Sequence, residues 1–110
     1  MEKLKKYYIY ILRCKDDSLY TGITTDIERR YEEHLEGKGA KYTRNKGIKK
    51  LEICFSCNGR SEASKIEYLL KKITRDQKER FILDFKRLEE YIEKNLNLKI
   101  KKENIFQKNY

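Results

Sequence analysis

The sequence predicts a small α/β domain in which a three-stranded, mainly antiparallel sheet is flanked by three or four helices. Residues 7–13 and 19–24 are short runs rich in aromatic, aliphatic and β-branched residues, and the polar stretch 15–18 separates them, which is typical of a β-hairpin. Residues 51–57 alternate in polarity, which indicates a third strand with one buried face. Apolar residues recur at helical spacing between and after these strands.

Length and charge indicate one domain with a polyanionic partner. A chain of 110 residues fits a single domain, which we place at residues 1–95, followed by a C-terminal tail at 96–110. The formal net charge of +9 favours binding to nucleic acid. The N-terminal apolar run ends at Arg13, far short of the roughly 20 residues that span a bilayer. We therefore expect a cytoplasmic protein with no membrane partner.

The hairpin is expected to be the functional centre of the chain. Residues 7–13 show no regular polar alternation, which favours a strand that is buried on both faces. Gly22 removes a side chain from the second strand, so we expect another backbone or a phosphate to approach closely there. Tyr10 and Tyr20 lie ten residues apart on the two strands.

A capping box predicts the start of the first helix. Residues 25–28 have the form T-x-x-E, in which Thr25 caps the helix and Glu28 reaches back. The helix should run from about 26 to 36, with Gly37 suited to its C-terminal cap.

The same helix should present two distinct faces. Ile27, Tyr31 and Leu35 recur every fourth residue and form the expected apolar stripe. Arg30 and His34 share a second face, one turn apart.

A long basic loop is expected before the third strand. Residues 37–50 hold three glycines, six lysines or arginines and no acid. A loop of this kind that also carries an aromatic residue is suited to lie along a phosphate backbone. We therefore predict contacts with nucleic acid at Lys38, Lys41, Tyr42, Arg44 and Lys46.

Two helices should follow the third strand. Ser61 is suited to cap the first, which should run to about Ile73, with Glu67 beside its apolar face. Thr74 and Gln77 form a second capping box, T-x-x-Q.

The helix that begins at this second box should extend to Ile92, because its apolar residues keep one period. From Asn95 the pattern loses any steady period, and a strand, a helix and a docked tail all remain open.

The three cysteines are expected to be buried thiols. An odd number argues against a disulfide framework. Cys54 and Cys57 form a C-x-x-C pair, but residues three apart on a strand point to opposite faces. We therefore favour packed thiols over a zinc site.

These motifs together resemble the GIY-YIG nuclease family. Tyr8-Ile9-Tyr10 corresponds to its first signature tripeptide and Tyr20-Thr21-Gly22 to its second, followed by Arg30 on a helix and Glu67 on a later helix. The resemblance runs from about residue 7 to 82, and the strings LYTGITTDIERR and HLEGKGAKYTR are similar to the small, single-domain YhbQ-like bacterial branch. Tyr8 departs from the family's glycine, Thr21 from its isoleucine, and Ile23 from the lysine of some members.

The resemblance implies metal-dependent phosphodiester hydrolysis. Glu67 would bind a single divalent ion, Mg²⁺ or Mn²⁺, and Arg30 would pair with phosphate oxygens. Tyr10 would be the general base, and Tyr20 would contact the phosphate or the water. Because tyrosine titrates near pH 10, we expect Arg30, the metal and His34 to favour the phenolate. His34 is alternatively expected to hold the tyrosine hydroxyl or relay its proton.

Two functions remain open at this level. The first is a metal-dependent endonuclease acting on nucleic acid, with DNA expected over RNA. The alternative is a nucleic-acid-binding module of the same fold that does not cleave, or that requires a partner to do so. The sequence pattern indicates no oligomeric state.

Overall fold

The computed structural model describes residues 4–104 and confirms the α/β class. The elements are β1 (Lys6–Cys14), β2 (Leu19–Thr24), α1 (Ile27–Leu35), α2 (Lys41–Lys46), β3 (Ile48–Asn58), α3 (Arg60–Lys72), α4 (Arg75–Leu83), α5 (Phe85–Leu96) and β4 (Lys101–Lys102). The described residues thus form four strands and five helices, more than the three strands and three or four helices that the sequence predicts. No helix in this part of the chain is long and apolar enough to cross a membrane.

The sheet has the order β2-β1-β3-β4, and every neighbouring pair is antiparallel. Central strand β1 places Tyr10 opposite Gly22 of β2 and opposite Cys54 of β3. Residues 9–12 of β1 are each at most 1% exposed, so the prediction of a strand buried on both faces is confirmed.

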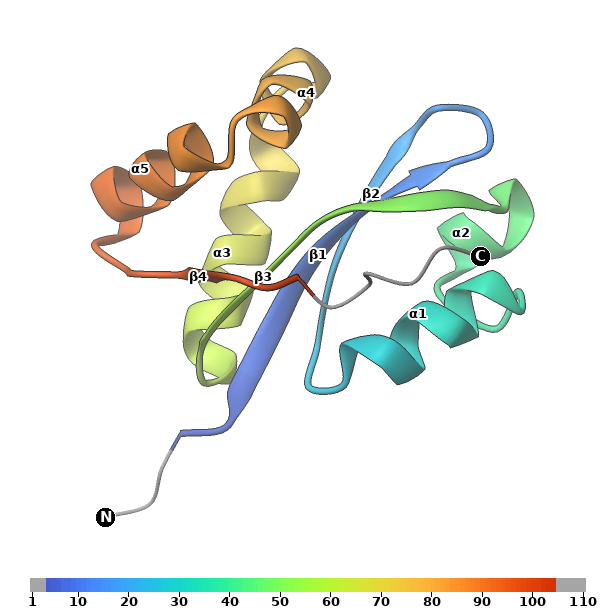
Figure 1. Cartoon of the computed structure of the whole chain (residues 1–110), viewed down its shortest axis with the longest axis horizontal. Helices are drawn as coiled ribbons and strands as arrows, with labels where there is room; N and C mark the ends of the chain where they lie inside the picture. Colours follow the sequence, from blue (N-terminus) through green and yellow to red (C-terminus); the bar gives the residue numbers. More distant parts are fainter. Residues whose placement is uncertain (1–3, 105–110) are drawn as a thin grey trace.

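Helices cover both faces of the sheet (Figure 1): α3, α4 and α5 lie on one side, and α1 and α2 lie on the other. The first side holds the larger core, in which Ile9, Ile11 and Phe55 pack against helix residues such as Ile66, Leu88 and Ile92. The second side holds a smaller cluster of Tyr10, Leu12, Cys14, Ile27, Ile48 and Cys54. The two faces therefore differ in chemistry, since only the second buries a catalytic candidate.

Strand β3 is buried on both faces from Ile53 to Cys57, and the prediction of a half-buried strand is wrong. The reason is that helices cover both sides of the sheet. Cys54 and Cys57 point into different clusters, as their spacing predicts. Burial raises the pKa of Cys54 to about 12 and that of Cys57 to about 11, so both thiols stay protonated at neutral pH.

Two helix caps differ from the prediction. Asp26, not Thr25, caps α1, because its carboxylate accepts the backbone N–H three residues on, at 3.2 Å. Helix α3 begins one residue before Ser61, after Gly59, whose φ of 92° suits glycine. The predicted apolar stripe of α1 is wrong at Leu35, which is 53% exposed. The buried residues of α1 are Ile27 and His34, which lie seven positions apart on one face.

The segment predicted as a loop contains a helix, and the long C-terminal helix is broken. Residues 41–46 form α2, which is too short and too polar to show a helical period. Thr74 accepts the backbone N–H of Gln77 at 3.2 Å, which confirms that cap. Asp84 both ends α4 and caps α5, although the apolar period continues across it.

Part of the predicted tail joins the sheet. Lys101 and Lys102 pair with Ser56 and Phe55 of β3, and Ile100 is 9% exposed. Of the three alternatives left open, these two residues form a strand. Ile105 and Phe106, the last apolar residues of the tail, lie outside the described residues.

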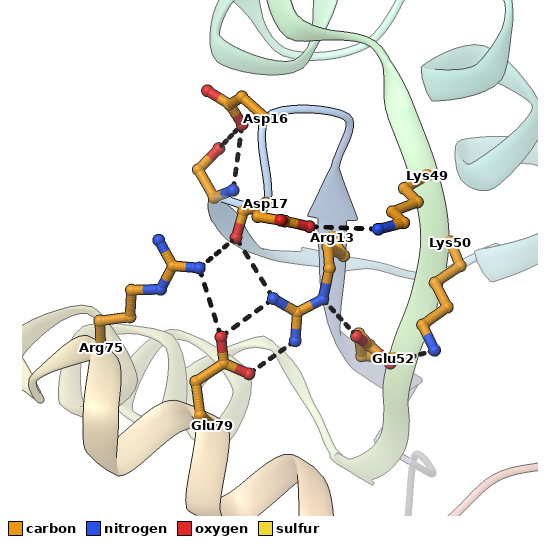
Figure 2. Close-up of polar contacts among 9 residues, drawn as sticks. Arg13, Asp16, Asp17, Lys49, Lys50, Glu52, Arg75 and Glu79 are labelled. Atoms are coloured by element: carbon orange, nitrogen blue, oxygen red, sulfur yellow. Dashed lines mark hydrogen bonds and ion pairs between the residues drawn. The ribbon is translucent and has the colours of Figure 1, made fainter.

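A cluster of charged residues joins the hairpin, β3 and α4 (Figure 2). We call it the Arg13 clamp, and it consists of Arg13, Glu52, Arg75 and Glu79. Arg13 donates from Nε to Glu52 at 2.5 Å and from both terminal nitrogens to Glu79 at 2.9 and 2.6 Å. Arg75 donates from Nη2 to the carbonyl of Asp17 at 2.6 Å. The clamp therefore fixes the start of α4 against the hairpin turn.

Candidate active site

A buried hydrogen bond links the first strand to the first helix. Strand β1 presents Tyr10 to the smaller cluster, and the last turn of α1 presents His34 to the same place. The Tyr10 hydroxyl lies 2.9 Å from His34 Nε2, and each residue is 1% exposed. A polar contact buried this completely holds both side chains in one geometry.

Thr43 of α2 determines which nitrogen of His34 carries the proton. The Thr43 hydroxyl donates to the carbonyl of Ala40 at 3.0 Å, and its oxygen lies 2.8 Å from His34 Nδ1. Since the hydroxyl proton is already used, the oxygen accepts from Nδ1–H. A neutral imidazole then has its lone pair on Nε2, so the Tyr10 hydroxyl donates to His34.

His34 is neutral at neutral pH. Burial, and secondarily the positive charge of Arg30, lower its pKa to about 4, although Glu33 opposes this. The ring is therefore ready to receive a proton at Nε2. It adds no positive charge beside Tyr10.

Two glycines make room for this pair. A Cβ on Gly22 would lie 2.5 Å from the Tyr10 hydroxyl oxygen, and one on Gly39 would lie 2.2 Å from His34 Nδ1. Both distances are shorter than any real contact, so only glycine leaves the rings where they are. At Gly22 the close approach comes from a phenol, in place of the backbone or phosphate that the sequence suggests.

Tyr20 and Tyr42 extend the aromatic surface outward. The Tyr20 ring centroid is 6.3 Å from that of Tyr10 and 5.4 Å from that of His34. On its other side Tyr20 stacks on Tyr42, at 6.1 Å and an interplanar angle of 27°. Tyr42 is 41% exposed, so the aromatic row leads from the buried pair to the surface.

Burial keeps Tyr10 a phenol. Burial, followed by the charge of Tyr20 and with a smaller contribution from Glu67, raises the pKa of Tyr10 to about 12. Arg30 lowers it through a hydrogen bond and its charge, but the opposing effects are larger. Arg30 thus favours the phenolate as predicted, whereas the neutral His34 does not, and burial outweighs Arg30.

Arg30 and Glu67 lie within electrostatic range of Tyr10. Arg30 donates from Nη1 to Glu33 at 3.0 Å, and its side chain is 30% exposed. Glu67 lies on α3 with its side chain 25% exposed, 3.3 Å from the ammonium of Lys71. The structure thus brings Tyr10, Tyr20, Arg30, His34 and Glu67 to one region from four elements.

The donor set around Glu67 fits a loosely held divalent ion. Within residues 4–104 no three histidine, cysteine, aspartate or glutamate side chains gather as a metal cage. Mg²⁺, however, keeps several waters and uses one or two carboxylates together with substrate phosphates. The competing pair with Lys71 is half exposed, and such pairs are weak. Glu67 is therefore available as the one protein ligand.

The predicted nucleic-acid contacts differ in their surroundings. Lys38 pairs with Glu36 at 3.3 Å, and Lys46 pairs with Asp16 at 2.6 Å while lying 4.8 Å from the Tyr42 ring centroid. Lys41 and Arg44 are exposed on α2, with no ion pair among residues 4–104. These two cations are the ones most available to an anionic partner.

Sequence reasoning missed Thr43 and Gly39. Thr43 contacts His34 from nine positions later in the chain, and Gly39 leaves room for the His34 ring. No local sequence pattern marks either contact. Gly39 offered the only signal, as one of two glycines on either side of Lys38.

Known proteins resemble this chain over most of its length. The GIY-YIG catalytic domain model matches residues 6–80. The chain is 45% identical over 96 residues to the UPF0213 protein FN1575 of Fusobacterium nucleatum, which covers 87% of this chain and 96% of that protein. It is 47% identical over 78 residues to the UPF0213 protein YhbQ of Escherichia coli, covering 71% and 78%.

A solved structure supports the same assignment. The solution structure of protein EF2693 from E. faecalis has a TM-score of 0.52 at 44% identity, covering 77% of this chain and 91% of that one. The matched residues include β1, β2, β3 and α1 to α3, and with α3 they include Glu67. The chain therefore belongs to the GIY-YIG family and is a member of its YhbQ-like branch.

Proposed function

We propose that this protein is a divalent-metal-dependent endonuclease that hydrolyses phosphodiester bonds in nucleic acid. One observation carries the proposal: a buried phenol donates to a neutral imidazole whose far nitrogen is held by a hydroxyl. This chain of three groups lies beside Arg30 and Glu67. Such an arrangement suits general base catalysis next to a phosphate site.

Tyr10 acts as the base through a relay. Its oxygen takes a proton from the attacking water while its own proton moves to His34 Nε2. The imidazolium that forms keeps its Nδ1–H on Thr43. No free phenolate is needed, so the raised pKa of Tyr10 does not prevent the step.

Arg30 and Tyr20 bind the phosphate. Arg30 uses one terminal nitrogen for Glu33, and its other donors are suited to phosphoryl oxygens, where negative charge develops. Tyr20 is half-buried next to Tyr10 and His34, so its hydroxyl orients the water or a phosphate oxygen.

Glu67 would hold the divalent ion. When bound there, the ion would supply neutralisation of the negative charge that develops in phosphodiester hydrolysis. Glu67 exchanges its contact with Lys71 for this role, which frees the Lys71 ammonium for the nucleic-acid backbone. DNA is the expected substrate over RNA.

A second function has its own support. Tyr10 is 1% exposed, so its hydroxyl reaches a water or a phosphate only if a ligand rearranges the surface above it. The alternative is a nucleic-acid-binding module that cleaves only with a partner or not at all.

Cleavage assays separate the two functions. Labelled plasmid, branched DNA, single-stranded DNA and structured RNA are incubated with Mg²⁺, Mn²⁺ or EDTA. The variants are Tyr10→Phe and Glu67→Ala, and the matched controls are Tyr68→Phe, at an exposed tyrosine of α3, and Glu90→Ala, at an exposed glutamate of α5.

The endonuclease proposal predicts metal-dependent cleavage by the parent and both controls, with loss in both site variants that remain folded. If the parent binds these nucleic acids but cleaves none, the binding module is the better description. Equal cleavage by parent and Tyr10→Phe refutes the relay.

A further inference from the structure

A pocket lies next to the proposed active site. It is lined by Ser18, Leu19, Tyr42, Arg75 and Lys78, which come from the hairpin, α2 and α4. Tyr42 stacks on Tyr20 at one wall. The pocket is thus adjacent to the aromatic row but shares no residue with the catalytic candidates.

Lys78 is a half-buried cation with no acidic partner. The other partly buried cations of this region, Arg13, Arg30 and Lys46, each reach a carboxylate within 3.0 Å. Lys78 forms no ion pair among the described residues. Burial and the positive charge of Lys71 lower its pKa, so a negative charge in the pocket would relieve an unfavourable environment.

Arg75 adds donors to the same pocket. Its Nη2 contacts the Asp17 carbonyl at 2.6 Å and Glu79 at 3.4 Å (Figure 2). A guanidinium has five N–H donors, and among the described residues Nη1 and Nε make no hydrogen bond. Because the Arg13 clamp fixes the guanidinium, these donors are already oriented.

The pocket is joined to the proposed metal ligand through one side chain. Lys71 is an electrostatic neighbour of Lys78 and pairs with Glu67 at 3.3 Å. One side of the pocket therefore borders Tyr20 and the other leads to Glu67. One nucleic-acid strand that lies along the aromatic row would therefore reach this pocket at Tyr42.

We propose that Lys78 and Arg75 form a second phosphate subsite, which holds a backbone phosphate of the same nucleic-acid strand that is cleaved at the Tyr10 site. The inference rests on the proposed function, because that function supplies the polyanionic ligand. The half-exposed ring of Tyr42 forms the wall against which the adjoining sugar packs. The subsite adds affinity and sets the direction of the strand.

Binding at varied salt tests the subsite. The inactive Tyr10→Phe protein, alone or with Lys78→Gln, Lys78→Arg or Lys94→Gln, is titrated with a fluorescent single-stranded oligonucleotide in EDTA. Lys94 is an exposed lysine of α5, so it controls for the loss of one charge. The slope of log K against log salt is about 0.7 per phosphate contact on a single strand.

We expect Lys78→Gln to reduce this slope by about 0.7, Lys78→Arg to preserve it, and Lys94→Gln to leave it unchanged. Equal slopes for Lys78→Gln and Lys94→Gln would overturn the subsite while leaving the proposed function intact.

A second measurement tests the subsite without the oligonucleotide, while the cleavage assays above test the proposed function. Inorganic phosphate is titrated into protein labelled at the lysine side chains, and the signal of each lysine is followed by NMR. A saturable rise in the pKa of Lys78, without a change at Lys94, supports an anion subsite that is independent of cleavage. An unchanged Lys78 signal refutes the subsite.

Discussion

Arg13 and Arg30 are both partly buried cations, but they differ in how many of their hydrogen-bond donors the protein uses. The guanidinium of Arg13 is satisfied by Glu52, Glu79 and a carbonyl oxygen, and its side chain is 14% exposed. Arg30 donates to the neighbouring Glu33, contacts Tyr10, and is 30% exposed. An arginine whose donors are taken by acids from other elements holds the fold together. An arginine with donors to spare beside a buried polar chain is available to a ligand.

The largest expected effect is on cleavage by Arg30→Ala. Loss of a donor aimed at developing charge lowers the rate by about 10²–10³-fold. The free energy of unfolding should change by less than about 1 kcal/mol, because the pair with Glu33 is partly exposed. Single-turnover cleavage and urea unfolding measure the two quantities. A large loss of stability would mean that Arg30 belongs with Arg13.

Arg13→Met should show the reverse behaviour. It leaves Glu52, whose side chain is 8% exposed, without its nearest cation, and breaking such a pair costs about 3 kcal/mol. Urea unfolding should show this loss, while cleavage per folded molecule stays near that of the parent. Arg29→Met, at an exposed arginine of α1, is the matched control. Unchanged stability of Arg13→Met would contradict the structural role of the clamp.

The two regions should respond to acid in different pH windows. The pKa of His34 is about 4 when folded and about 6.5 when unfolded, so the unfolded chain binds the extra proton between these values. Stability therefore falls as pH drops from about 6.5 to 4, by up to roughly 3 kcal/mol. Arg13 lowers the pKa of Glu79, and the stability this contributes is lost only as pH falls below about 4.5.

Urea unfolding of parent, His34→Gln and Arg13→Met across this range separates the windows. His34→Gln should remove the loss between pH 6.5 and 4.5, and Arg13→Met should weaken the loss at lower pH. A parent whose stability is constant down to pH 4.5 would show that the histidine is not buried in the neutral form.

Thr43 gives the smallest and most specific test. Thr43→Val keeps the shape but removes the oxygen that accepts from His34 Nδ1, so we expect cleavage to fall about 10–100-fold, as for other supporting hydrogen bonds. Thr43→Ser should restore it. His34 is the only histidine of the chain, so its ¹⁵N signals report the tautomer directly. A Val variant that keeps the Nδ1–H form would show that Thr43 only packs.

The features that could be predicted from the sequence are those that depend on residues close together along the chain. The paired strands, the helix carrying Arg30 and the cap at Thr74 follow from alternation and from residue types at fixed spacing. The family motif added Tyr10, Tyr20 and Glu67. Their meeting in one region agrees with that prediction, and their catalytic roles remain predictions.

The remaining features depend on contacts between distant residues. Glu52 and Glu79 are 39 and 66 positions from Arg13, so no local pattern relates them. The pKa of Tyr10 is raised, and not lowered as the sequence suggests, because burial by distant residues has the largest effect on it. Asp84 lies within a continuous apolar period, and only the packing of α4 and α5 shows that it separates two helices.

The double cap at Asp84 limits which insertions and deletions the chain can tolerate. Because Asp84 is the only residue between α4 and α5 and both ends the first helix and caps the second, one inserted residue would separate these two roles and change the packing of α4 against α5. Such a change would disturb the position of Arg75 and Lys78 beside the hairpin. Between α5 and β4, by contrast, four residues separate the elements, and a change in length there would leave α4 in place. Length variation during evolution should therefore be absent at residue 84 and concentrated at 97–100.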